Sequence, residues 1–394
     1  MNNYYELESG LLQLPAFCDM HTHLREPGFA YKETIYTGTK AAAKGGYTMV
    51  LTMPNLNPPP DNLENLNVQM DIIKKSAVID VMAFASITKG QLGKGELSDM
   101  DRLAPFVAGF SDDGKGIQDK GLMKEAMSHA KKLKKAIIAH CEDNSLIQEG
   151  GVVDEVVASK FGLIGISRES EWKQIERDLN LAAITGCRYH VCHISTAEGV
   201  NLVREAKKSH IKVSCETAPH YLSLSQEDMV DDGKFKMNPP LRSRFDKEAL
   251  IKGLWDGTID IIATDHAPHT AEEKSKGLKG SSMGVVGLET AFSVMYTMLV
   301  KTGIIDLNKL IELMAIRPRQ LLRLFDGSNE KIDKINADYI VDKLKDYVII
   351  DSDKSFVIKK EEFMSMGKST PFENMSVIGE IQKTVHRGRT VYKK

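Results

Sequence analysis

One stretch near the N-terminus of this chain has the sequence Phe17-Cys18-Asp19-Met20-His21-Thr22-His23-Leu24-Arg25-Glu26-Pro27-Gly28. Its apolar first half predicts a buried β-strand, and the Pro-Gly pair predicts a turn after it. Side chains alternate between the faces of a strand, so His21 and His23 point to the same side, roughly 6–7 Å apart at the backbone. Two neutral imidazoles at this spacing can bind one metal ion. Alone, the His-x-His pattern is a weak indication, because most such pairs are ordinary core or surface histidines.

The composition is that of a globular protein. The 394 residues are 42% hydrophobic and 27% charged, enough for one large domain with an appendage or for two ordinary domains. The net charge is −2 and the Lys and Arg residues are scattered, so we expect no binding to nucleic acid or to a membrane surface. We find neither the pattern of a signal peptide nor an apolar run that approaches the ~20 residues of a transmembrane helix.

The chain has five cysteines, an odd number, and no Cys-x-x-Cys pair. They are Cys18, Cys141, Cys187, Cys192 and Cys215. Three of them fall inside predicted strands and the other two lie within two residues of one, which suits reduced, buried thiols. We therefore expect a cytoplasmic protein without disulfides.

Short apolar, β-branched runs alternate with helix-like segments through the first 270 residues. The predicted strands cover residues 14–20, 47–53, 80–87, 106–110, 136–139, 188–192, 211–215 and 259–263. The predicted helices cover residues 31–44, 65–75, 121–135, 168–185, 197–209 and 246–253. Strands that alternate with helices pair in parallel, and eight such units form a (β/α)₈ barrel. An open doubly wound sheet is the alternative, but no Gly-rich phosphate loop follows the first strand. We predict an α/β fold of the TIM-barrel type.

The chain changes character after about residue 323. Short antiparallel strands joined by charged turns are predicted at residues 335–339, 347–351, 355–359, 377–381 and 384–392. They predict a small β appendage formed mainly by the C-terminal segment. We therefore predict a barrel over residues 14–325 and a small, β-sandwich-like appendage made of residues 1–13 and 326–394.

Polar residues gather where the predicted barrel strands end. Catalytic groups of this fold come from the C-terminal ends of several strands. Seven of the 11 histidines follow such ends, namely His21, His23, His140, His193, His220, His266 and His269. Structural histidines would not concentrate in this way. With Asp265 at the end of the eighth strand, they predict a metal centre that suits Zn²⁺, with Mn²⁺ or Fe²⁺ as substitutes.

Eight motifs in one order extend this interpretation. They are HTHLREPG at 21–28, MPN at 53–55, FSDDG at 110–114, HCED at 140–143, CHIST at 192–196, ETAPH at 216–220, KMNPPLR at 236–242 and TDHAPH at 264–269. Over nearly its whole length the chain thereby resembles the amidohydrolase superfamily, and within it the type I dihydroorotases. Each motif alone is modest evidence, but eight in the right order are highly specific.

The resemblance implies a ligand set for one or two Zn²⁺ ions per subunit. His21, His23 and Asp265 would bind one ion, and His140 and His193 the other. Many relatives bridge the two ions with a carboxylated lysine from the fourth strand. This chain has Asp112 and Asp113 at that place, as in the bacterial type I enzymes. The resemblance favours Asp113 as the bridging ligand, while Asp112 is expected to form local hydrogen bonds at the turn.

The resemblance also implies an activity, that of a zinc-dependent cyclic amidohydrolase. The reaction would be the reversible cyclisation of N-carbamoyl-L-aspartate to L-dihydroorotate plus water in de novo pyrimidine biosynthesis. In the hydrolytic direction a metal-bound hydroxide would attack the ring amide, with Asp265 as general acid and base.

A carboxylate-bearing substrate needs a cationic partner, and Arg25 can bind a carboxylate through two hydrogen bonds. In the resembling family Asn55 and His269 complete this site, and Asn238 would bind the ring amide. For Arg25 the alternative is a salt bridge at the rim, for example with Glu26.

Three further expectations concern the surroundings of the site. Asp19 shares a strand face with His21 and His23 and could orient one of them. The role of His220 stays open between substrate contact and structure. The polar, Gly-rich segment 270–284 is expected to border the substrate and to be mobile.

Two other functions compete with this interpretation. Another cyclic amidohydrolase, an allantoinase or a dihydropyrimidinase (hydantoinase), predicts a bridging lysine and has no need of Arg25. A catalytically silent paralogue that scaffolds aspartate transcarbamoylase would lack metal ligands, whereas every ligand position here is filled. The sequence leaves open a homodimer and an association of an active enzyme with aspartate transcarbamoylase.

Overall fold

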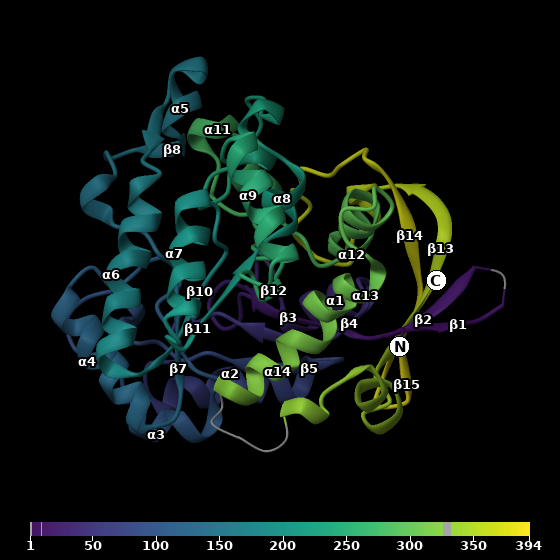
Figure 1. The fold of residues 1–394 in the computed structure, drawn as a ribbon, viewed down its shortest axis with the longest axis horizontal. Coiled ribbons are helices and arrows are strands. Elements are labelled where there is room, and N and C mark those ends of the chain that lie inside the picture. Colours follow the sequence, from purple (N-terminus) through teal and green to yellow (C-terminus); the bar gives the residue numbers. More distant parts are fainter. Residues whose placement is uncertain (1, 9, 326–331) are drawn as a thin grey trace.

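A computed structural model describes residues 2–8, 10–325 and 332–394. Within these residues, eight parallel strands form the centre of the molecule (Figure 1). They are β3 (Phe17–Thr22), β4 (Tyr47–Thr52), β5 (Asp80–Ala83), β6 (Phe110–Ser111), β7 (Ala136–Ala139), β10 (Arg188–Val191), β11 (Val213–Thr217) and β12 (Ile261–Ile262). Several are shorter than the apolar runs that predict them, because the ladder ends where the chain turns into the loops.

The strands close into a ring. Two ladders run in the orders β3-β4-β5 and β6-β7-β10-β11-β12. Single parallel bridges join their edges, from Ala85 to Phe110 and from Thr22 to His266. At these joints Ser111 N donates to Ala85 O at 2.8 Å and His23 N to His266 O at 2.9 Å. The predicted (β/α)₈ barrel is therefore confirmed.

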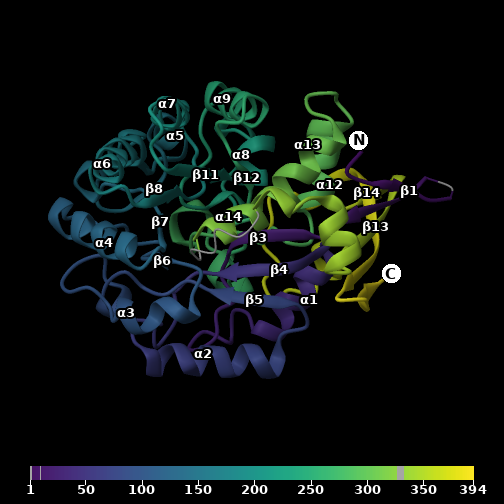
Figure 2. The same ribbon diagram turned by 60° about the horizontal axis from the view of Figure 1, so that its bottom comes forward.

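Helices lie around this ring (Figure 2). They are α1 (Ile35–Lys44), α2 (Leu63–Ser76), α3 (Met100–Leu103), α4 (Lys120–Lys132), α6 (Glu169–Thr185), α7 (Ala197–Lys208) and α9 (Arg244–Trp255). Five of them begin at a side chain that accepts a hydrogen bond from the first helical turn, which satisfies an otherwise unpaired N–H group. These caps are Thr34, Asn62, Asp119, Thr196 and Ser243.

The end of the barrel opposite the loops that follow the strands is closed by a helix that no predicted segment covers. After α12 (Ala291–Met295) and α13 (Leu307–Ile311), helix α14 (Arg317–Phe325) lies across the middle of the strand ring (Figure 2). Its Leu321 and Phe325 pack in one buried cluster with Met20 and Ile138 of the strands. Buried Arg319 donates to Ala16 O at 2.7 Å. Because α14 fills this end, the opposite end is left for a site.

The C-terminal segment forms an antiparallel sheet beside the barrel, where both chain ends lie (Figure 1). Its order is β1 (Tyr5–Glu6), β2 (Leu11–Pro15), β13 (Tyr347–Val357), β14 (Ser376–His386) and β15 (Arg389–Lys393). The two predicted strands 347–351 and 355–359 are a single bent strand, with a register shift between Asp351 and Ser355.

The strand predicted over residues 335–339 is wrong. Asn336 Oδ1 accepts a hydrogen bond from Tyr339 N at 2.9 Å. Such a cap starts a helical turn. The chain continues as a π-helical turn, Tyr339–Lys343, which buries Ile340 and Val341. Two adjacent buried side chains are compatible with a helical turn as well as with a strand. The apolar run alone therefore cannot distinguish a helical turn from a strand.

The predicted division into domains stays a prediction. Its first boundary, between residues 13 and 14, falls inside β2, which pairs with β13 through its whole length. Its second boundary adjoins residues 326–331, which lie outside the described part of the chain, as do residues 1 and 9.

Two further features lie outside the predicted pattern. A two-stranded insertion with β8 (Gly151–Asp154), α5 (Glu155–Ala158) and β9 (Ile164–Ile166) stands between β7 and α6. Buried Arg242 fixes it to the barrel, because its Nη1 donates to Asp154 Oδ2 at 2.8 Å. None of the helices in the described residues has the length and apolarity to cross a membrane.

Candidate metal and substrate site

The predicted site residues meet at the carboxyl ends of the barrel strands. Nine of the ten line one cavity of about 620 Å³, a volume that includes open space at its mouth. These are His23, Arg25, Asn55, Asp113, His140, His193, Asn238, Asp265 and His269. The tenth, His21, is fully buried beneath them. Segments that follow seven different barrel strands converge there, which is the usual place of a site in this fold.

The histidines and aspartates form two groups of metal-ligand geometry. In the first, Asp265 Oδ1 lies 3.1 Å from His23 Nε2 and 3.5 Å from His21 Nε2. In the second, Asp113 Oδ1 lies 3.7 Å from both His140 Nδ1 and His193 Nε2. Asp113 Oδ1 is also 3.4 Å from His21 Nε2. Asp113 therefore lies between the two groups, where a bridging ligand would be needed.

The residues fit a bound cation. His21 Nε2 and Asp113 Oδ1 are buried, face each other, and have no hydrogen-bond partner. Buried polar atoms without partners are costly, and a cation between these two would satisfy both. Imidazole nitrogens and carboxylate oxygens are a donor set that suits a divalent ion of the zinc type.

The two carboxylates are ionised. Burial by itself would raise the pKa of Asp113, but the charge of His21 and the nearby imidazoles of His193 and His23 hold that pKa well below its usual range. Burial likewise opposes ionisation of Asp265, yet the neighbouring His21 and His23 lower the pKa of Asp265 to about 2. Cys192 also lies beside His21, but burial raises the pKa of its thiol strongly, so that it stays protonated and is a poor ligand.

Carboxylates behind the imidazoles set their orientation. Glu216 Oε1 lies 2.6 Å from His21 Nδ1, and Glu216 Oε2 lies 3.1 Å from His190 Nε2. Glu142 Oε2 lies 3.2 Å from His140 Nε2. A carboxylate accepts the proton of one ring nitrogen and leaves the other nitrogen free to bind a metal. The other nitrogens, His21 Nε2 and His140 Nδ1, face Asp113, and His140 Nδ1 also lies 3.0 Å from His193 Nε2.

Neither acid was predicted from the sequence, which pointed to Asp19 instead. Asp19 Oδ1 accepts from the backbone N of His21 at 2.9 Å, and Asp19 Oδ2 accepts from the backbone N of Thr264 at 3.1 Å. It fixes the backbone beside two ligands but contacts neither imidazole. A signal for the correct acids existed, because Glu142 and Glu216 are carboxylates at strand ends, inside the HCED and ETAPH motifs.

The backbone is strained at three site residues. Arg25, His193 and Asp265 have φ angles of 61°, 29° and 49°, in the left-handed region that non-glycine residues rarely adopt. Each such residue costs of order 1–3 kcal/mol and persists only where the surroundings impose it. Strain at three side chains that face one cavity supports a functional role for that cavity.

Arg25 faces the cavity without an acidic partner. Its Nε donates to Pro268 O at 3.2 Å, and within the described residues no carboxylate lies within ion-pair distance of it. Glu26, the alternative partner, instead accepts from Ile35 N at 2.7 Å. Burial lowers the pKa of Arg25 to about 10, so that it remains charged at neutral pH. A partly buried guanidinium of this kind is ready to bind an anion.

Asn55 and Asn238 stand beside the candidate metal ligands. Asn55 Nδ2 donates to the backbone oxygen of Asp113 at 2.6 Å, while its Oδ1 has no partner. Asn238 Nδ2 donates to Glu142 Oε2 at 3.1 Å. Both amides therefore lie within the cavity wall, and their contacts with a substrate stay predictions.

Asp112 and His220 are placed differently from the cavity residues. Asp112 accepts hydrogen bonds from the backbone N of Ile87, Thr88 and Gly93, the local turn role expected for it. His220 is buried but lies outside the cavity lining, with its ring against Tyr221. Burial lowers the pKa of His220 to about 4, so it is neutral.

Segment 270–284 borders the cavity, as predicted. It contains α10 (Ala271–Lys274) and α11 (Gly277–Gly280), and its end, Met283 and Gly284, lines the cavity. The predicted mobility of this segment is untested.

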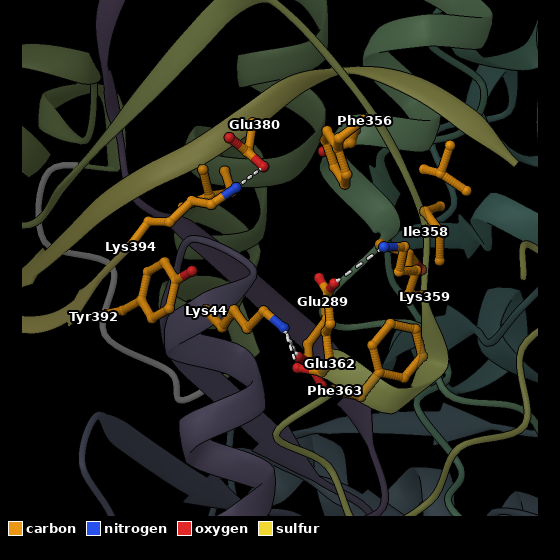
Figure 3. Close-up of a pocket in the computed structure, with 14 residues that line it drawn as sticks. Lys44, Glu289, Phe356, Ile358, Lys359, Glu362, Phe363, Glu380, Tyr392 and Lys394 are labelled. Carbon is orange, nitrogen blue, oxygen red and sulfur yellow. Dashed lines mark hydrogen bonds and ion pairs between the residues drawn. The ribbon is translucent and has the colours of Figure 1, made fainter. Parts of the chain in front are cut away.

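A second cavity of about 570 Å³ lies between α1, α12 and the C-terminal sheet (Figure 3). Its charged groups pair among themselves. Lys44 Nζ lies 3.0 Å from Glu289 Oε2, and Lys394 pairs with Glu380. It contains none of the predicted site residues, and its charges are neutralised within its own walls.

Comparisons with known proteins agree with the site. A family model described as dihydro-orotase-like matches residues 10–199. The chain is 49% identical over 377 residues to the dihydroorotase of Fusobacterium nucleatum, which covers 95% of this chain and 86% of that protein. It is 48% identical over 388 residues to the dihydroorotase of Shouchella clausii, which covers 98% of this chain and 88% of that protein.

A solved structure shares the fold. The L-hydantoinase of Arthrobacter aurescens superposes with a TM-score of 0.84 at 24% identity, over 97% of this chain and 85% of that one. At this identity the likeness concerns the fold alone. The sequence matches, which run over nearly the whole chain at close to half identity, show that the chain belongs to the dihydroorotase family.

Proposed function

We propose that this protein is a dihydroorotase, which cyclises N-carbamoyl-L-aspartate to L-dihydroorotate plus water and catalyses the reverse hydrolysis. The observation that carries the proposal is the position of Arg25, a charged guanidinium that lies in the cavity with the candidate metal ligands and has no acidic partner among the described residues. A neutral cyclic amide leaves such a cation unpaired, whereas the carboxylate of dihydroorotate pairs with it.

Zinc is the proposed metal, with one or two ions per subunit. His21, His23 and Asp265 would hold one ion, His140 and His193 the other, and Asp113 both. A divalent ion in such a site polarises the amide carbonyl and lowers the pKa of a water bound beside it.

Asp265 is proposed as the general acid and base. Its carboxylate faces the cavity and is ionised, since neighbouring histidines hold its pKa at about 2. It can accept the proton that water loses on attacking the ring carbonyl and deliver a proton to the departing ring nitrogen. In the cyclisation direction the same carboxylate removes the proton from the attacking nitrogen.

The substrate carboxylate is assigned to Arg25, Asn55 and His269. Arg25 comes from the loop after β3, and His269 from the loop after β12, with Arg25 Nη2 and His269 Nε2 3.4 Å apart. Asn238, across the cavity beside His140, is proposed to bind the ring amide.

The test is an assay of both directions on one protein sample, before and after chelation, with the metal content measured in parallel. We expect turnover of dihydroorotate and carbamoyl aspartate that falls with the metal and returns when Zn²⁺ is added. Asp265→Asn should reduce kcat by about 10²–10⁴-fold, the usual contribution of general acid–base catalysis, with an unchanged circular dichroism spectrum. Metal-independent turnover, or turnover of hydantoins but not dihydroorotate, would contradict the proposal.

The proposal extends to assembly and location. A homodimer and a complex with aspartate transcarbamoylase are tested by light scattering of the protein alone and after mixing with that enzyme. A cytoplasmic location is supported by the five cysteines, which are all buried and free. Fractionation of the source cells tests it.

A further inference from the structure

Lys32 joins the two loops that carry the proposed carboxylate site. It lies in the loop between Arg25 and α1, and its side chain is 15% exposed. Its Nζ is 3.2 Å from His269 Nδ1 and 2.8 Å from Glu273 Oε1. His269 and Glu273 belong to the loop after β12, so this one ammonium group bridges segments that approach the cavity from opposite sides of the joint between β3 and β12.

The contacts of His269 define its tautomer. A backbone carbonyl only accepts hydrogen bonds, and Met283 O lies 2.8 Å from His269 Nε2, so Nε2 carries the proton. An ammonium only donates, so Nδ1, which faces Lys32 Nζ, carries the lone pair. The two contacts agree on one neutral form of the ring.

The competing arrangement would place the proton on Nδ1. Glu273 Oε2 lies 3.5 Å from that atom and could accept it. That carboxylate is already engaged, since Oε2 accepts from Thr270 N at 2.9 Å and Oε1 pairs with Lys32. The electrostatics point the same way, because burial and then the charges of Arg25 and Lys32 lower the pKa of His269 to about 3.

This tautomer places an N–H donor of His269 beside Arg25. His269 Nε2–H and Arg25 Nη2–H are both donors, and 3.4 Å between two donors is not a hydrogen bond. They stand side by side, so that the Nε2–H donated to Met283 O can be shared with one oxygen of an entering carboxylate while Arg25 serves the other oxygen. The pair works only while Nε2 carries a proton: Met283 O accepts that proton, and Lys32 keeps it off Nδ1.

We propose that Lys32 is a positioning residue of the substrate-carboxylate site, which holds His269 in the Nε2–H tautomer so that it acts with Arg25 as a paired donor. The assignment rests on the proposed function for the identity of the anion. Glu273 holds Lys32 in turn, so that the loop after β12 is in place whenever the donor pair is formed.

The test uses Lys32→Met, which keeps the length of the side chain and removes the ammonium, and Lys32→Arg, which keeps a donor. Lys40→Met is the matched control, since Lys40 is also partly exposed, lies on α1 and contacts neither His269 nor Glu273. The first readout is the ¹⁵N NMR spectrum of His269, assigned with His269→Gln, which reports the tautomer directly. The second is the separation of KM from kcat for dihydroorotate.

We expect Lys32→Met to lose the single Nε2–H tautomer and to raise KM about 10-fold, with kcat within about 2-fold, because a charge-assisted donor to the substrate is lost. Lys32→Arg should restore both, and Lys40→Met should change neither. An unchanged His269 spectrum in Lys32→Met would overturn the proposal, whether or not KM moves. The NMR readout needs no turnover, so a wild-type protein that does not process dihydroorotate would refute the proposed function while the hold of Lys32 on His269 is still measured.

Discussion

Single side chains behind the imidazoles decide which nitrogen of each ring faces the metal centre. His21 gives its Nδ1 proton to Glu216 and His140 its Nε2 proton to Glu142, so that the two histidines use different nitrogens toward Asp113. Glu216 also binds His190, and although burial opposes its ionisation, the neighbouring His21 and His190 hold the pKa of Glu216 far below its usual range. It is thus a fixed negative charge beneath His21.

Glu216→Gln should weaken metal binding about 10–100-fold, because an amide cannot accept the His21 proton as strongly and the free nitrogen becomes less basic. Competition with a chelator of known affinity measures the change. Glu176→Gln, an exposed site on α6, is the control and should bind metal like the wild type. Equal affinity in Glu216→Gln would show that Glu216 serves the fold and not the metal.

Arg25→Ala should raise KM for dihydroorotate about 10–150-fold, since hydrogen bonds to a charged group contribute roughly 1.5–3 kcal/mol. The kcat should change little, because the guanidinium is proposed to bind a part of the substrate that does not react. Steady-state kinetics in both directions give the two constants. A fall in kcat at constant KM would place Arg25 in the chemistry instead of in binding.

The roles of some individual residues could be predicted from the sequence. Two adjacent aspartates, Asp112 and Asp113, stand at one strand end, and alternation of side chains already implied that only one could be a ligand. Asp113 does face His21, while Asp112 turns to the backbone of Ile87 and Thr88. The acids that orient the rings could not be assigned, because which carboxylate meets which ring depends on the neighbouring strand.

Among the elements, the loop between β12 and α12 is held in its conformation by one buried lysine. Lys274 Nζ donates to the backbone oxygens of Lys236, Ser282 and Gly284, at 3.0, 2.7 and 2.7 Å. Three acceptors match the three donors of an ammonium group. The end of the loop is thereby fixed where Gly284 lines the cavity and Met283 O meets His269.

Lys274→Met should loosen this loop, because it leaves three backbone carbonyls without their donor, at a cost of roughly 1–3 kcal/mol for each one that water cannot reach. Hydrogen–deuterium exchange over residues 275–285 should become faster, and KM should rise as the wall of the cavity becomes mobile. Lys279→Met, exposed in the same loop, should leave exchange unchanged. Wild-type exchange in Lys274→Met would contradict this role.

The elements themselves were predictable where their pattern is local. Alternating apolar runs and capped helices gave the barrel strands and helices, with α1 and α6 beginning within four residues of the expected place. The failures are segments whose structure depends on what they pack against. Residues 335–339 lead into a helical segment instead of a strand. Helix α14 comes after other helices and not after a barrel strand, and it fills the barrel end with Leu321 and Phe325.

In the whole molecule, a cluster of charges fixes the C-terminal sheet to the barrel. His386, the last residue of β14, lies 3.1 Å from Asp346 and 3.5 Å from Asp80 at the start of β5. Arg387 pairs with Asp80 at 2.8 Å. Burial alone would lower the pKa of His386, but the two carboxylates outweigh it and raise that pKa from 6.5 to about 9.

This raised pKa predicts how stability depends on pH. The folded protein binds the His386 proton more tightly than the unfolded chain, so the contribution is complete below the unfolded pKa of 6.5 and is lost as pH rises through about 9. The Tm difference between the wild type and His386→Gln should therefore be largest near pH 6 and vanish towards about pH 10. Thermal melts across this range measure it, with His129→Gln on α4 as control. A difference that does not change with pH would mean that His386 acts through packing alone.

The amino-acid sequence determined the barrel and the candidate metal ligands, because both depend on patterns that are local along the chain. The alternation of strands and helices specifies parallel pairing, and the residue that ends each strand specifies what lies at the rim. Tertiary structure alone decided the partners of those residues. His21 meets Glu216 across 195 positions and Lys32 meets His269 across 237. Contacts at such separations arise only when the ring closes between β3 and β12, and no local pattern records which side chains that closure brings together.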